Sequence, residues 1–263
     1  MLANSKVNWN TYAQKYDMLL AYNPFYTQLQ QEVMEEVRKW GIRPGDLLAD
    51  IGAGTGNYSL ALAETFPQAK VLHIDRDEGM NAHAADKRSL AQLNNHEIIP
   101  LGVDEIELEP NSLDGLISIH ALYTFSDPDA VLSNMCHWLK PGAAAVLVDA
   151  GRMANVLGWQ VALGSQLIKE HGIRKTLEIF REGKEVSRQN GYIRKMQRSG
   201  EFWTHSHEAF CESVQQAGFE IEHNVTCYRG YSDLVVVRKP LPVTNAVFNH
   251  YGAQAYEKSS HLA

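Results

Sequence analysis

The stretch LLADIGAGTGNYS, residues 47–59, joins an apolar run to a turn that holds three glycines. The run at 47–51 is typical of a β-strand, and a helical pattern follows the turn at 58–66. A strand, a glycine-rich turn and a helix in this order are typical of α/β folds that bind nucleotides, because glycine lets the backbone approach the ligand. The stretch therefore predicts an α/β fold with a nucleotide ligand at this turn.

The rest of the first half repeats the alternation of strand and helix. Further strands are predicted at 71–75, 97–101, 113–119 and 143–149, with helices at 78–93 and 129–139. Pro141 and Gly142 are predicted to end the last of these helices and to turn the chain into the next strand. Such alternation is typical of βαβ units and predicts a parallel sheet.

The second half adds a helical insert, a helix at 206–217 and a hairpin around Arg229 and Gly230. Five parallel strands and this antiparallel hairpin predict a Rossmann-like, seven-stranded α/β sheet with a helical cap. We divide the chain into an N-terminal helical lid at 1–40, a core at 41–150 and 201–240, a helical cap insert at 151–200 and a C-terminal tail at 241–263.

Composition excludes several classes of protein. The first residues lack the basic segment and apolar run of a secretory signal, and no stretch approaches ~20 apolar residues. The three cysteines are scattered, which argues against disulfides and a zinc site, and the histidines lack metal-site spacing. A net charge of −7 disfavours a protein that coats nucleic acid. We therefore expect a cytoplasmic protein with no membrane span and no metal.

The glycine turn does not fit the commonest nucleotide motifs. A dinucleotide-binding unit needs a third glycine where this chain has Asn57, and a phosphate-binding P-loop needs a Gly-Lys-Ser/Thr sequence that is missing. No lysine or arginine stands in the turn to meet phosphates. The sequence therefore argues against a nicotinamide, a flavin or a nucleoside triphosphate.

Acidic residues at the strand ends indicate a different nucleoside. Asp50 precedes the glycines, where a carboxylate would repel a pyrophosphate but accept from an ammonium group. Asp75 ends the second strand, where an acid accepts from both ribose hydroxyls. Asp104 and Glu105 follow the third strand, where an acid can accept from the adenine amino group. Ammonium, ribose and adenine in this order predict S-adenosylmethionine.

This pattern of D-x-G-x-G-x-G and two later acids resembles the class I S-adenosylmethionine-dependent methyltransferases, over roughly 45–150 and 203–238. The resemblance is greatest to the small-molecule branch that includes ubiquinone-type enzymes. It implies that Gly52 and Gly54 approach the methionine part of the cofactor, that Arg76 flanks the adenine, and that His120 lines the methionine end. The implied product is S-adenosylhomocysteine.

Aromatic residues near the N-terminus are candidates for the acceptor side of the site. The family commonly has a Tyr-rich helix here that closes over the cofactor, so Tyr16 is predicted to contact the cofactor and to act in catalysis. Tyr12 and Trp159 are predicted to contact the substrate, although packing against the core is an equal reading for the tyrosines. His120 is the first candidate for a general base, ahead of His205 and His207.

The insert is unusually basic: from Lys169 to Arg198 it holds nine Lys and Arg against four Glu, a net charge of +5. This charge favours an anionic acceptor or partner, with a solvated helix pair as the alternative. We predict methyl transfer to oxygen, nitrogen or carbon of a small apolar or anionic acid. An RNA methyltransferase and a silent cofactor-binding protein are the alternatives, with nucleic acid disfavoured by the net acidity, and a homodimer stays open.

Overall fold

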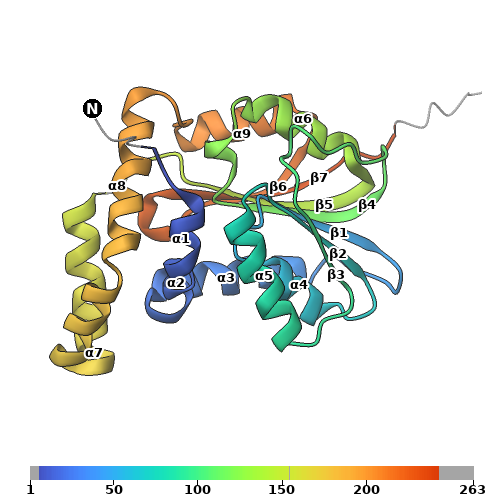
Figure 1. Ribbon diagram of the computed structural model, residues 1–263. Helices are drawn as coiled ribbons and strands as arrows, with labels where there is room; N and C mark the ends of the chain where they lie inside the picture. The colour runs from blue at the N-terminus through green and yellow to red at the C-terminus, as the bar shows by residue number, and fades with distance from the viewer. Residues whose placement is uncertain (1–5, 154, 243–263) are drawn as a thin grey trace, which may run out of the picture.

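Seven strands form one sheet in the order β3-β2-β1-β4-β5-β7-β6 (Figure 1). The computed structural model describes residues 6–153 and 155–242, so nearly all of the predicted tail lies outside the described residues. The strands are β1 Leu47–Ile51, β2 Lys70–Ile74, β3 His96–Ile99, β4 Leu113–Ile119, β5 Leu139–Asp149, β6 Glu220–Cys227 and β7 Ser232–Arg238. Strands β1 to β5 are parallel, and β7 runs antiparallel to β5 and β6. The predicted seven-stranded sheet is confirmed.

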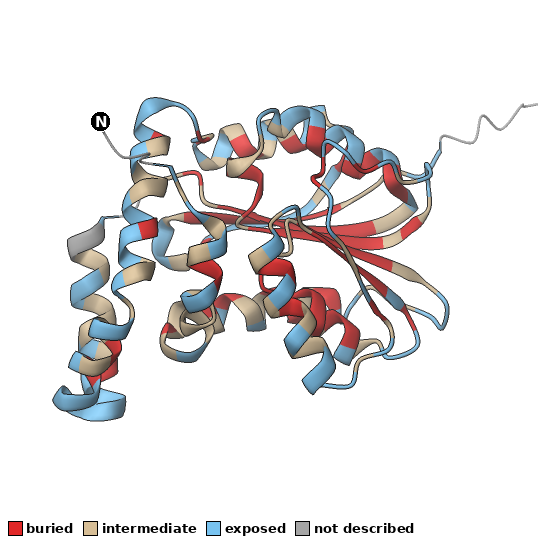
Figure 2. Ribbon diagram, in the orientation of Figure 1, coloured by how far each residue is buried: buried red, intermediate tan, exposed pale blue. Residues whose placement is uncertain are grey.

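Helices cover both faces of the sheet, which explains the continuous apolar runs of the central strands. On one face lie α3 (Pro24–Val37), α4 (Ser59–Thr65) and α5 (Glu78–Leu90); on the other lie α6 (Pro128–Trp138) and α9 (His207–Gln216). In Figure 2 the buried residues concentrate along the strands and the inner faces of these helices. Leu48, Ala49 and Ile51 of β1 are completely buried. The strand order reverses between β1 and β4, where a doubly wound sheet opens a crevice for ligands.

The predicted lid at 1–40 divides into two parts. Helix α1 (Trp9–Tyr16) packs on α5, and α2 (Met18–Tyr22) lies at the margin of the core, whereas α3 packs against the sheet through Leu29, Val33 and Val37. Asn23 caps α3 by accepting from the backbone N–H of Phe25 at 3.1 Å. The third helix of the predicted lid therefore belongs to the core.

The cap insert consists of α7 (Val156–Glu182) and α8 (Lys184–Ser199). Gly172, with φ 75°, breaks α7 into two arms that fold back on each other, and α8 runs beside α1 (Figure 1). At the base of the insert, the Arg152 guanidinium holds the buried Asp233 carboxylate of β7 by two hydrogen bonds of 2.7 and 2.9 Å. The cap is thereby fastened to the sheet.

Strand β5 begins earlier than the sequence predicts. Leu139 already pairs with Leu113, and the register then shifts so that Ala144 pairs with Gly115. Gly142 absorbs this irregularity with φ 81°, a conformation that side chains disfavour. The Pro-Gly pair therefore marks an irregular strand rather than the turn that was predicted.

Candidate functional site

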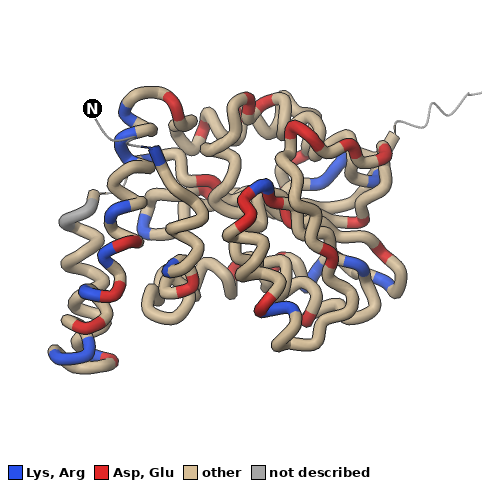
Figure 3. Tube along the Cα trace, in the orientation of Figure 1, with Lys and Arg blue, Asp and Glu red and all other residues tan. Residues whose placement is uncertain are grey.

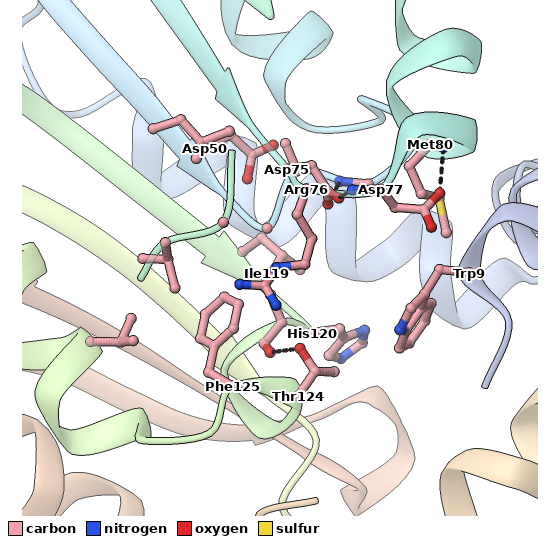
Figure 4. A pocket seen from close by; sticks show the side chains of 18 of the residues that line it. Trp9, Asp50, Asp75, Arg76, Asp77, Met80, Ile119, His120, Thr124 and Phe125 are labelled. Atoms are coloured by element: carbon pink, nitrogen blue, oxygen red, sulfur yellow. Dashed lines mark hydrogen bonds between the residues drawn. The ribbon is translucent and has the colours of Figure 1, made fainter. Parts of the chain in front are cut away.

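A cavity of about 810 Å³ opens at the carboxyl ends of β1, β2 and β4. Its walls come from the glycine turn after β1, the loops after β2 and β4, α1 and the end of α8. Figure 4 shows Asp50, Asp75 and Asp77 along one side, with Thr124, Phe125 and His120 opposite and Trp9 beside them. The cavity is thus placed at the crevice where this topology binds ligands.

The glycine turn forms the floor of the cavity, and its conformation depends on glycine. Gly52 has φ 74° and Gly54 has φ 56°, both in the left-handed region. A Cβ at Gly52 would lie 2.4 Å from the Cβ of Ala121, so any side chain there would displace the loop after β4. Asn57, at the position where a third glycine was missed, instead accepts from Lys87 Nζ of α5 at 2.8 Å.

Asp50 ends β1 below this turn and is almost completely buried, with 2% exposure. The backbone N–H of Ser59 donates to its carboxylate, but Oδ2 has no hydrogen-bond partner. Burial, together with the charge of Asp75, raises the pKa of Asp50 to about 8. The side chain is therefore a buried acceptor that lines a cavity and lacks a cation.

Asp75 follows β2 and is oriented by the backbone. Its Oδ2 accepts from the N–H of Gly54 and its Oδ1 from the N–H of Asp77, both at 2.8 Å. Burial raises the pKa of this carboxyl from its usual value. These two bonds fix the carboxylate at the cavity wall and leave each oxygen able to accept one more hydrogen bond.

Of the two acids after β3, Asp104 lines the cavity and Glu105 binds the backbone of its own loop. Asp104 lines the cavity and forms an ion pair with Arg76, which also lines it. Glu105 turns back, and its Oε2 accepts from the N–H of Gly102 at 2.8 Å. The structure thus brings Asp104 and Arg76 to the site and does not bring Glu105 to it.

His120 stands at the end of β4 in a strained backbone conformation with φ 54°. Its backbone N–H donates to the carbonyl of Val148 at 2.7 Å, and the ring Nε2 lies 2.8 Å from Ser232 Oγ. Burial lowers the pKa of the ring to about 4, so His120 is neutral near pH 7. It lines the cavity where the sequence placed it.

Of the two tyrosines of α1 that were predicted to face the site, only one lines the cavity. Tyr16 lines the cavity, and burial raises its pKa to about 12, so its hydroxyl keeps its proton. Tyr12 packs against Tyr16 with ring centroids 5.1 Å apart, but its hydroxyl donates to Asn190 Oδ1 of α8 at 2.8 Å. Tyr12 therefore joins the lid to the cap and does not line the cavity.

Trp159 also lies away from the cavity that was predicted to hold the substrate. Its ring packs against Phe25 and Tyr228, with centroids 5.4 and 4.8 Å apart, and the Arg229 guanidinium stands 5.1 Å from its centroid. These contacts join α7 to α3 and to the turn after β6. Its position is explained by packing.

Several lining residues were not predicted as site residues. Trp9 and Tyr26 belong to the aromatic N-terminal run, which was the available signal for them. Tyr58 follows the glycine turn directly, whereas Met196 and Phe202 reach the cavity from the end of the cap without any recognisable motif.

Charge in the cavity is mostly negative. The acidic side chains that line it are those of Asp50, Asp75, Asp77, Asp104, Asp127 and Glu201, of which Asp50 is mostly protonated near pH 7 because burial raises its pKa to about 8. Among the described residues, Arg76 is the only Lys or Arg in the lining, and it is paired with Asp104. The insert carries many Lys and Arg positions along its helices (Figure 3), but none of them is among the described residues that line the cavity. Arg174 and Lys175, for example, pair with Glu178 on α7. In the described part of the chain, the basic insert therefore supplies no positive charge to the cavity wall.

Residues 6–153 and 155–242 contain no group of three or more His, Cys, Asp or Glu side chains arranged to hold a metal ion. Within the same residues, no helix has the length and apolarity needed to cross a membrane.

Comparison with known proteins finds similarity in the part of the chain that holds β1 to β4. Residues 48–142 match the family described as methyltransferase domain. A demethylmenaquinone methyltransferase of Oceanobacillus iheyensis is 27% identical over 129 residues, which are 49% of this chain and 54% of that protein. The chain thus spans about half the length of this curated relative.

Solved structures show the same fold. A putative S-adenosylmethionine-dependent methyltransferase from Methanococcus maripaludis has a TM-score of 0.58 at 18% identity, covering 93% of this chain and 100% of that chain. Magnesium protoporphyrin IX methyltransferase from Synechocystis, with bound S-adenosylhomocysteine, has a TM-score of 0.54 at 18% identity, covering 82% and 85%.

Proposed function

We propose that this chain, whose residues 48–142 match a methyltransferase domain, transfers a methyl group from S-adenosylmethionine to an apolar small-molecule acceptor. The observation that carries the proposal is the placement of Asp50 and Asp75 around the glycine turn, in one cavity at the crevice of the sheet. The family match and the folds of the neighbours support the same reading.

The residues of the cavity fit this cofactor. The unpartnered Oδ2 of Asp50 suits a buried ammonium group, since a cation would supply the partner that the free protein lacks. The fixed carboxylate of Asp75 suits the two ribose hydroxyls, as in other folds that bind a nucleoside after the second strand. Arg76 and Asp104 would then flank the adenine.

The cofactor supplies an electrophilic methyl group, and the chain's own residues would position the acceptor and exclude water. His120 is a weak base, because burial holds its pKa at about 4. Tyr16 keeps its proton and can donate a hydrogen bond, but it cannot take a proton near pH 7. Proximity and desolvation therefore account for more of the proposed reaction than general base catalysis does.

The acceptor side favours an apolar molecule over an anionic one. Trp9, Met196 and Phe202 provide apolar and aromatic surface, and Glu201 adds a negative charge. An anionic acceptor would meet carboxylates without a free cation among the described lining residues, which is unfavourable in a partly closed cavity. The apolar alternative is in line with the relative named for demethylmenaquinone.

The experiment is incubation of the protein with methyl-deuterated S-adenosylmethionine and a cell extract, followed by mass spectrometry of metabolites and RNA separately. Label in one or a few apolar metabolites is the expected result and would identify the acceptor. Label in RNA would instead support a macromolecular methyltransferase. Cofactor binding without any labelled product would favour the silent binding protein.

A further inference from the structure

Two side chains that line the cavity each hold a buried polar atom without a hydrogen-bond partner in the protein. They are Oδ2 of Asp50 and the hydroxyl oxygen of Tyr58, in side chains that are 2% and 4% exposed. Other unpartnered buried atoms in the described residues, such as Nε1 of Trp40 and Oγ of Ser112, belong to residues that do not line this cavity. Because an unpaired buried polar group costs stability, a ligand that pairs both groups is the simplest reason for them.

Asp50 and Tyr58 both lie near the start of α4. The N–H of Ser59 donates to the Asp50 carboxylate, and Tyr58 is the residue directly before Ser59. One of the two free groups is an acceptor and the other is a hydroxyl able to donate. Burial raises the pKa of Tyr58 well above its usual value, so the hydroxyl stays protonated. An α-amino acid carries an ammonium and a carboxylate on one carbon, which matches this pair.

The neighbouring tyrosines show that Tyr58 is exceptional. The Tyr26 ring packs edge-to-face on Tyr58 with centroids 6.0 Å apart, but its hydroxyl accepts from Asn57 Nδ2 at 3.4 Å. The Tyr228 hydroxyl accepts from Asn23 Nδ2 at 2.9 Å. These two hydroxyls each have a hydrogen-bond partner within the protein, whereas that of Tyr58 has none.

A carboxylate in this cavity has few other donors. Arg76, the single Lys or Arg among the described lining residues, is held by Asp104 after β3, at the proposed adenine end. The Thr124 hydroxyl already donates to the carbonyl of Ala121 at 2.7 Å. The Tyr16 hydroxyl is hydrogen-bonded to that of Tyr26. Among the lining tyrosines of the described residues, Tyr58 is therefore the one whose hydroxyl has no partner in the protein.

We propose that the Tyr58 hydroxyl donates to the α-carboxylate of S-adenosylmethionine while Asp50 accepts from its ammonium group. The inference rests on the proposed function and assigns a role to a residue that the acidic motif of the cofactor site does not include. Tyr58 is then a binding residue for the amino-acid end, and it selects ligands that carry a carboxylate.

The test compares Tyr58→Phe with the parent protein by isothermal titration calorimetry, using S-adenosylmethionine and its decarboxylated analogue, which keeps the ammonium group. Loss of a hydrogen bond to a charged group should weaken binding of S-adenosylmethionine about 10- to 100-fold. Binding of the decarboxylated analogue should be the same in both proteins. Thermal unfolding of the free variant should show no loss of stability, because the hydroxyl has no partner to lose.

Tyr26→Phe is the matched control, since it removes a hydroxyl from the adjacent ring without touching the proposed contact. It should not discriminate between the two ligands. Parental affinity of Tyr58→Phe for S-adenosylmethionine, or equal weakening of both ligands, would overturn the carboxylate contact alone. A parent protein that binds neither ligand would overturn the proposed function and this inference together.

Discussion

Binding of S-adenosylmethionine should release a proton from Asp50. In the free protein this carboxyl is buried without a partner for Oδ2, and its pKa is raised to about 8. It is therefore mostly protonated at pH 7. A bound ammonium group would favour the ionised form and lower the pKa, so the complex holds fewer protons than the free protein. By linkage, affinity must rise with pH until pH exceeds the pKa of the free site.

The size of the effect follows from the pKa of about 8. If Asp50 is fully ionised in the complex, affinity should increase about 50-fold between pH 6 and pH 8 and flatten above. At pH 7 about 0.9 proton should be released for each ligand bound. The range stops near pH 8 because an α-amino group begins to lose its own proton at about that pH.

The assay is titration calorimetry at pH 7 in two buffers of different ionisation enthalpy, which measures the released proton directly, and affinity at several pH values. Asp50→Asn is the matched variant: it should bind weakly, release no proton and show a flat profile. The ligand 5′-methylthioadenosine lacks the amino-acid end and should release no proton from the parent. A pH-independent affinity of the parent, or the same slope in Asp50→Asn, would refute the assignment of Asp50 to the ammonium group.

Three further predictions concern the cofactor site, the core and the cap. Asp75→Ala should weaken cofactor binding roughly 100-fold without unfolding the protein, because hydrogen bonds to a charged acceptor are lost; equal affinity in calorimetry would contradict the ribose contact. Burial lowers the pKa of His73 to about 3 and of His96 to about 4, so the unfolded chain binds more protons below pH 6.5. Each histidine should thus lower the free energy of unfolding by about 2 kcal/mol as pH falls from 7 to 5. Urea unfolding measures this as the difference between the parent and a variant with both His→Gln substitutions, because Asp50 titrates in both proteins. Arg152→Ala should lower the free energy of unfolding by about 3 kcal/mol, because it leaves the buried Asp233 short of its cation, and Arg152→Lys should restore part of it in the same assay.

The sheet could be predicted from the sequence because its signals are local. Each central strand is buried on both faces and reads as a short apolar run, and each is followed by a helix with its own period. The positions of Asp50 and Asp75 follow from that sheet, since the carboxyl ends of parallel strands share one edge. A side chain at the carboxyl end of a central strand is placed at the crevice by the sheet itself, so its position can be predicted once the strand is predicted.

Side chains on loops and on added helices could not be placed in this way. Asp104 and Glu105 are adjacent, yet only Asp104 lines the cavity, because the Glu105 side chain satisfies the N–H of Gly102 instead. Tyr12 and Tyr16 share one face of α1, yet α8 takes the hydroxyl of Tyr12. These outcomes depend on tertiary partners that are remote in the sequence, so residue type and spacing do not reveal them.

The basic insert illustrates a related limit. Its positive charge is plain from composition, but composition does not show on which side of a helix a charge lies. In the structure, the Lys and Arg side chains of α7 and α8 stay out of the cavity lining, and the apolar Val161, Ile173 and Leu177 are exposed rather than turned towards the site. The charge of an insert therefore describes the surface of the cap, and the chemistry of the acceptor has to be read from the cavity wall.

Asp50 and Tyr58 each have a buried polar atom without a hydrogen-bond partner in the protein. In a protein interior a buried carboxyl and a buried phenol normally have partners, and leaving them unpaired lowers the stability of the free protein. A sequence can suggest that Asp50 faces a cation, but it cannot show that an atom has no partner, because that depends on every neighbour at once. A bound zwitterion would pair both groups and remove this cost. The affinity of the proposed site and the lower stability of the free protein therefore have one physical origin.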